Sequence, residues 1–170
     1  MKIKLTIKIA TIFIIVLTSA LFSFSKKKKL SIDGVWSFVE IKTVKSDGSF
    51  SSIYPKEGIA IFSNNHYSFC WTSHISKLRT WQITDSLKLN RFNQSIVNTG
   101  TFELKEDVLS TKAIFAMNPM FTNGLAKFKC SFNGDTLLLT GLSVISSDNI
   151  SHPVYANGSH FVNKLLKVSK

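Results

Sequence analysis

The sequence lacks the residue patterns that most catalytic and metal sites require. It has no Cys-x-x-Cys, no His-x-His, no Gly-x-Ser-x-Gly and no glycine-rich phosphate loop. Its ten acidic residues are scattered, so no carboxylate pair indicates glycoside hydrolysis. Its four histidines stand apart from one another: they are His66, His74, His152 and His160. The sequence therefore predicts no metal, no cofactor and no recognisable catalytic group.

Cysteine is also scarce, because the chain contains only Cys70 and Cys130. A chain of 170 residues is long enough to bury a core without disulfides or metals. In an oxidising compartment the two cysteines could pair and close a long loop. The alternative, which we favour, is two buried thiols that act as small apolar side chains. Cys130 alternates with Phe128 and Phe132, which indicates that all three face the same packed side.

The chain has only 10 acidic residues against 21 lysines and arginines, and much of its net charge of +11 lies near the N-terminus. Seven lysines lie there, namely Lys2, Lys4, Lys8 and the run 26–29. Without them the rest of the chain carries about +4, and it has no basic stripe that alternates with aromatics. Nucleic-acid binding is therefore not expected. The run 26–29 is either a solvated tail, which we favour, or a contact for anionic lipid headgroups.

The chain has no apolar run of the roughly 20 residues that a membrane-spanning helix needs. Residues 9–24 form an uncharged stretch behind three lysines, and Ser23 and Ser25 suit a leader-peptide cleavage site. This order predicts a signal peptide at 1–25, a lysine-rich linker at 26–31 and export to the cell envelope, periplasm or exterior. Because the lysine run resists translocation, the alternative is an uncleaved N-terminal anchor. A lipid anchor is not expected, since no cysteine lies near the leader.

Helical periodicity is rare after residue 30, where apolar residues alternate with a period of two. This alternation predicts eight strands, at 34–44, 58–63, 67–73, 100–104, 108–115, 125–132, 136–142 and 160–168. Asn133-Gly134 is the strongest hairpin turn, and Asn64-Asn65 predicts another tight connection. Thr84-Asp85 predicts the start of a short helix over 86–93.

Sequential strands with short turns predict an all-β fold, an antiparallel meander of about eight strands that closes into a barrel. Closure removes the exposed strand edges that an open sheet would present. A barrel of this size is either filled by its own side chains or holds one small ligand. We expect residues 32–170 to form this single domain.

Two segments carry a resemblance to a known family. Residues 31–40 (SIDGVWSFVE) resemble the opening of lipocalin-like domains, which begin with Gly-x-Trp, here Gly34 and Trp36. Residues 133–140 (NGDTLLLT) resemble a late hairpin of small bacterial lipocalin-like domains. The resemblance implies a calycin-type barrel. It also implies a structural role for Gly34 and Trp36, with the tryptophan packed across the closed end.

One feature departs from the family pattern. Classical secreted lipocalins stack an arginine from a late strand on that tryptophan. This sequence has no arginine after Arg91, and Lys164 and Lys167 are the only cations of the last predicted strand. The departure favours a divergent calycin-like barrel over a classical lipocalin.

Six residues are candidates for a ligand pocket, because strand alternation groups them with the motif tryptophan or with other aromatics. They are Phe38, Glu40, Tyr67, Phe69, Trp71 and Phe128. Trp81 is a further aromatic candidate. The alternative is that the aromatics are simply core. For Glu40 we favour a place in water at the barrel mouth, although alternation points it inward with Phe38.

Three functions remain open from the sequence. The first, which we favour, is an exported lipocalin-like protein that binds a small hydrophobic molecule in a barrel cavity. The second is a barrel enzyme of the cyclase or isomerase type, which would need a polar group such as Glu40 or His74 inside the cavity. The third is an envelope interaction protein with a filled barrel. Fold alone does not separate them.

Overall fold

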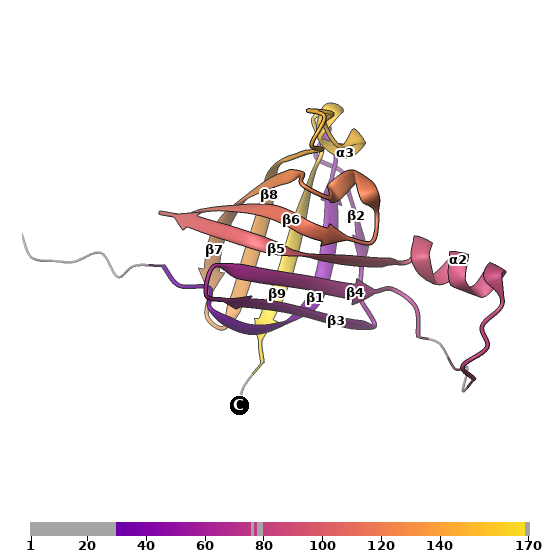
Figure 1. The fold of residues 1–170 in the computed structure, drawn as a ribbon. Coiled ribbons are helices and arrows are strands. Elements are labelled where there is room, and N and C mark those ends of the chain that lie inside the picture. Colours follow the sequence, from indigo (N-terminus) through magenta and orange to yellow (C-terminus); the bar gives the residue numbers. More distant parts are fainter. Residues whose placement is uncertain (1–29, 76, 78–79, 169–170) are drawn as a thin grey trace, which may run out of the picture. The chain divides into compact units, whose positions relative to one another are not determined.

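The computed structural model describes residues 30–75, 77 and 80–168. The predicted signal peptide at 1–25 and the lysine run at 26–29 lie outside the described residues. Nine strands occur in the described chain (Figure 1). They are β1 (Gly34–Val44), β2 (Phe50–Ile53), β3 (Glu57–Ser63), β4 (His66–Thr72), β5 (Ser95–Lys105), β6 (Val108–Ala116), β7 (Leu125–Asn133), β8 (Thr136–Ile145) and β9 (His160–Lys167).

The strands form a closed antiparallel barrel. From β3 to β9 each strand pairs with its neighbour in sequence, and β9 returns to pair with β1. The strands β2 and β3 both pair with β1, β2 along Ile41–Val44 and β3 along Gly34–Ser37. β2 and β3 therefore occupy one strand position of the barrel between them, so the nine strands form an eight-stranded barrel. The all-β, eight-stranded antiparallel barrel predicted from alternation is confirmed.

Short turns fix the register of the hairpins. The turn between β3 and β4 consists of Asn64 and Asn65, whose φ angles are 48° and 61°. Asparagine tolerates this left-handed region better than most residues, and two such residues in succession match the twist of the flanking strands. The turn between β7 and β8 places Gly134 at φ 57°. Both turns were predicted from the sequence.

One end of the barrel is filled by its own side chains. Four leucines that point inward from three strands have no accessible surface: Leu109, Leu137, Leu139 and Leu165. Phe62 is 1% exposed and meets Phe69 and Phe102 edge to face, at centroid distances of 5.5 and 5.4 Å. Such pairs add to the stabilisation that burial of the rings already supplies.

Trp36 lies within this packed region and is held by two polar contacts. Its indole Nε1 donates a hydrogen bond of 2.8 Å to the carbonyl of Ile32, and it is 2% exposed. The ammonium of Lys167 lies 4.4 Å from the centre of the indole ring. Gly34 has φ +125°, and a Cβ there would come within 2.5 Å of Lys167 Nζ. Only glycine meets both the conformational and the spatial demand at position 34.

A β-bulge in β1 reverses the alternation that the sequence suggests. The pairing of β1 with β9 shifts register between Phe38 and Glu40, with Val39 as the extra residue. Phe38 and Ile41 are buried, whereas Val39 and Glu40 are not. The expectation that alternation points Glu40 inward beside Phe38 is therefore wrong, because one additional residue turns every following side chain to the other face.

The described helices are short and lie outside the sheet. The predicted helix over 86–93 is confirmed as α2 (Asp85–Asn93), which contributes no buried residue. Thr84 is its N-cap but makes no side-chain capping bond. A 3-10 turn, η1 (Pro119–Phe121), follows β6, and a single turn, α3 (Pro153–Ala156), precedes β9. None of the described helices is long and apolar enough to cross a membrane.

Candidate functional site

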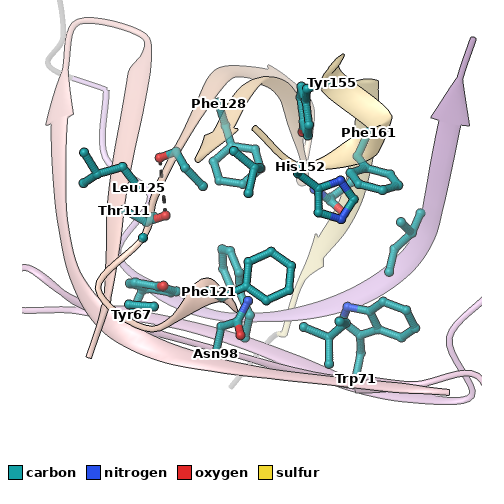
Figure 2. Close-up of a pocket in the computed structure, with 18 of the residues that line it drawn as sticks. Tyr67, Trp71, Asn98, Thr111, Phe121, Leu125, Phe128, His152, Tyr155 and Phe161 are labelled. Atoms are coloured by element: carbon teal, nitrogen blue, oxygen red, sulfur yellow. Dashed lines mark hydrogen bonds between the residues drawn. The ribbon is translucent and has the colours of Figure 1, made fainter. Parts of the chain in front are cut away.

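A cavity of about 280 Å³, partly open to solvent, occupies the barrel interior away from the leucine-filled end. This volume is close to the lower limit of roughly 300 Å³ for small-molecule sites. Its walls come from every strand of the barrel except β3, and η1, α3 and their flanking loops contribute side chains as well. The apolar lining includes Phe38, Ile41, Tyr67, Phe69, Trp71, Ile96, Phe121, Phe128, Val144 and Phe161. Figure 2 labels Tyr67, Trp71, Phe121, Phe128 and Phe161 of this set and shows them around a common space.

Five of the six pocket candidates from the sequence line this cavity, from three different strands. They are Phe38, Tyr67, Phe69, Trp71 and Phe128. Strand alternation identified them because none of these positions follows a bulge in its own strand. Three of the five also pack on one another: Phe69 meets Phe38 at a centroid distance of 5.7 Å and Tyr67 at 5.0 Å. The cavity wall is thus continuous with the aromatic core.

The sixth candidate, Glu40, is not among the lining residues. Beyond the bulge it accepts a hydrogen bond of 2.6 Å from Ser52 Oγ on β2 and lies 3.9 Å from Lys42 Nζ. Its carboxylate therefore helps to hold β2 against β1. Trp81 and His74 are exposed and lie outside the cavity as well. The enzyme hypothesis named Glu40 and His74 as polar groups inside the cavity, and neither of them lies there.

His152 lies in the cavity and was not singled out as a site residue from the sequence. It is the N-cap of α3, and its Nδ1 accepts a hydrogen bond of 3.3 Å from the backbone N–H of Val154. Phe121 stacks on the imidazole at 5.9 Å, and Tyr155 and Phe161 meet it edge to face. Burial lowers the pKa of His152 below its usual value of 6.5. The ring is consequently neutral at pH 7.

A signal for this site existed in the sequence. Proline is favoured at the first position of a helix, and Pro153 occupies that position directly after His152. A His-Pro pair inside a polar loop therefore predicts a helix start with the histidine as cap. Nothing in the local pattern shows that the loop folds over the barrel and directs the imidazole inward.

The side chain of Tyr155 extends from α3 into the barrel. Its hydroxyl lies against Gly141 of β8, so close that a Cβ at position 141 would overlap it. The hydroxyl is buried and has no hydrogen-bond partner among the described residues, although the backbone of Phe161 lies nearby. Burial raises the pKa of Tyr155 to about 12. The phenol is therefore protonated and able to donate.

Asn98 faces the cavity from β5, across the cavity from Tyr155 in Figure 2. Its Oδ1 is buried without a hydrogen-bond partner in the described chain. Thr111, by contrast, is satisfied, because its hydroxyl donates to the carbonyl of Ala126 at 3.4 Å. Asn98 was missed because the sequence places the start of its strand at Gly100, whereas β5 begins at Ser95.

No residue that lines the cavity carries a carboxylate, an ammonium or a guanidinium. Within the described residues, no three His, Cys, Asp or Glu side chains gather as a possible metal site. The cavity can thus bury apolar surface and form neutral hydrogen bonds. It holds no carboxylate that could orient or activate His152 as a base.

Both cysteines are free thiols in the structure. Cys130 lies on β7 and is 3% exposed, and Phe128 on the same strand is 8% exposed, as alternation predicted. Phe132, which was predicted to face the same packed side, is 39% exposed, although the centre of its ring lies 5.9 Å from that of Trp36. Burial raises the pKa of the Cys130 thiol to about 12. Cys70 is half-buried on β4, with Ser68 Oγ at 3.6 Å from its Sγ.

Comparison with known proteins identifies no relative of this chain. No protein-family model matches the sequence, no curated protein matches it, and no solved structure matches the fold.

Proposed function

We propose that the protein is a lipocalin-like barrel that binds one small, mainly apolar molecule in its cavity. The observation that carries the proposal is the contrast between the two ends of the barrel. One end is filled by buried leucines and aromatics, whereas the other has a cavity of about 280 Å³ between mainly apolar walls. Interiors are normally packed to the density of organic crystals, so an apolar space of this size is typical of a binding site.

The contacts of the Gly-x-Trp motif support the lipocalin-like part of the proposal. Trp36 is buried at the packed end, as the resemblance implies. The ammonium of Lys167 lies over its ring, where classical lipocalins use an arginine. Lysine and arginine can each place a cation on the face of an indole ring. Lys167 therefore preserves the cation–π interaction, although it lacks the planar guanidinium of arginine.

Binding is favoured over catalysis by the composition of the cavity. His152 is the one histidine among the described residues that line the cavity, and none of the lining residues is a carboxylate that could act with it. Export through an N-terminal leader, or attachment by that segment, remains part of the proposal. It would place the carrier in the cell envelope or outside the cell.

Native mass spectrometry of the protein purified from cells without detergent, followed by organic extraction, tests the proposal. We expect an adduct that disappears on extraction. In the variant Ala126→Phe, a ring fills the cavity, and the adduct should be lost. Lys127→Phe is the matched control, since it places the same ring on the exposed side of the neighbouring residue. A bare mass from several hosts and lipid extracts would count against binding and favour the interaction protein.

A further inference from the structure

We propose that the molecule bound in this cavity is uncharged and carries a hydroxyl group, which hydrogen-bonds with Asn98 on one side of the cavity or with His152 or Tyr155 on the other. The inference rests on the proposed function and specifies the chemical class of the ligand. It derives from three polar side chains that have unused hydrogen-bonding capacity in a mainly apolar cavity, whose other polar lining side chains include Thr111 and Asn163.

The absence of charge in the lining excludes a buried ionic group on the ligand. None of the lining side chains is Asp, Glu, Lys or Arg, and His152 is neutral at pH 7. Moving a carboxylate or an ammonium group out of water without a partner costs several kcal/mol. A carboxylic acid, an amine or a phosphate ester would therefore be bound far more weakly than a neutral molecule of the same shape.

His152 offers one hydrogen-bond donor of known position on the ring. Because the backbone N–H of Val154 donates to Nδ1, that nitrogen carries no proton, and the proton of the neutral ring lies on Nε2. No hydrogen bond of Nε2 occurs in the described structure. The stacked Phe121 and the edge-on Tyr155 and Phe161 hold the ring in this orientation. The donor is thus fixed before a ligand arrives.

Asn98 and Tyr155 each bury an oxygen without a partner. A buried polar atom left without a hydrogen bond costs about 1–3 kcal/mol, and such atoms are rare in folded proteins. Asn98 Oδ1 only accepts, whereas the Tyr155 hydroxyl donates and accepts. Tyr155 lies beside His152, and Asn98 faces them across the cavity, so each side has an unused polar group that a polar group of the ligand can satisfy.

A hydroxyl is the smallest neutral group that satisfies this set. It can donate its proton to Asn98 Oδ1 on one side of the cavity, and it can accept from His152 Nε2 or from the Tyr155 hydroxyl on the other. A ketone or an ester accepts only and leaves Asn98 Oδ1 unsatisfied. An alkane leaves all three groups unsatisfied. Hydrogen bonds of this kind set specificity, because the wrong ligand leaves buried groups unpaired.

Three matched probes test the inference: 2-naphthol, naphthalene and 2-naphthoate, titrated at pH 7 into the full chain after organic extraction. We expect 2-naphthol to bind about five to ten times more tightly than naphthalene, the value of one additional hydrogen bond. We expect 2-naphthoate to bind at least about a hundred times more weakly than 2-naphthol, since its charge loses solvation without a partner. The variant Ala126→Phe should abolish binding of all three.

Two conservative variants keep the test independent of folding. Asn98→Leu is close in shape and removes a buried unsatisfied oxygen, and Tyr155→Phe removes one atom. At least one of the two variants should reduce the preference for 2-naphthol over naphthalene to less than about twofold. Equal binding of naphthalene and 2-naphthol, or tight binding of 2-naphthoate, overturns the inference and leaves the proposed function standing. Failure of all three probes to bind overturns both.

Discussion

The Nζ of Lys167 lies 4.4 Å from the centre of the Trp36 ring and donates a hydrogen bond of 2.6 Å to the carbonyl of Asp33. The two residues are far apart in sequence, on the first and last strands. Their contact therefore joins the ends of the described chain across the point where the barrel closes. Backbone pairing of Trp36 with Lys167 in the ladder between β1 and β9 places the two side chains for it.

Replacement of Lys167 tests the value of this contact. Lys167→Met keeps the apolar stem but loses the charge and the hydrogen bond, and we expect it to lower the free energy of unfolding by about 1–2 kcal/mol. Lys167→Arg should stay within about 0.5 kcal/mol of the wild type, because a guanidinium stacks on indole equally well. Urea denaturation measures both. Lys164→Met, an exposed position on the same strand, is the control, and an equal loss there would contradict the role of Lys167.

Gly34→Ala should be more destabilising than an ordinary glycine substitution. Its φ of +125° is a region that is almost closed to residues with a side chain, and the added Cβ would displace the Lys167 ammonium. We expect a loss of about 2–3 kcal/mol by urea denaturation. Gly48→Ala separates the two causes, since Gly48 has φ +82° but no atom within 4 Å of its added Cβ. A loss at Gly34 no larger than that at Gly48 would show that the lysine does not matter.

The sequence was informative about the strands because most of them bury one face. Alternation identified β1 with correct bounds and placed Phe38 and Phe128 on the inside. It failed for β2, since this strand has four residues and none of them is buried. Phe50 in β2 is 63% exposed and packs under Lys42. A strand without a buried face leaves no alternation to detect.

The candidate site was less predictable, because its polar groups depend on irregular backbone. The bulge at Val39 moved Glu40 out of the interior, and single bulges leave no mark in a hydrophobic pattern. His152 and Tyr155 enter the cavity from a loop and one helical turn. Their direction is decided by packing on Phe161 of the following strand and on Phe121, which is about 30 residues away in sequence. Local propensity contains no information on such contacts.

His152 should make the stability of the protein depend on pH. Its pKa is lowered in the folded state by burial, so the unfolded chain binds a proton at about 6.5 and the folded chain only at lower pH. The stability that the neutral ring contributes is therefore complete above 6.5 and is lost as the pH falls towards the folded pKa. Protonation of Nδ1 also removes the acceptor for the N–H of Val154.

The variant His152→Asn isolates this effect. Asparagine is a favoured N-cap and accepts the same backbone hydrogen bond, but it does not titrate. We expect urea midpoints of the wild type to fall more steeply between pH 7 and pH 5 than those of the variant. The other histidines are present in both proteins and cancel in the comparison. Parallel pH profiles would show that His152 is not buried as neutral imidazole.

The two thiols should differ in reactivity. Cys70 is half-buried on β4, whereas Cys130 is 3% exposed and its pKa is raised to about 12, so almost no thiolate forms there at pH 8. With an aromatic disulfide reagent we expect one thiol to react in the native protein and two in guanidinium chloride. Cys70→Ser should remove the native reaction, and Cys130→Ser should leave it unchanged. If no thiol reacts in guanidinium chloride until a reductant is added, the cysteines are paired and the barrel around Cys130 is packed differently from the structure.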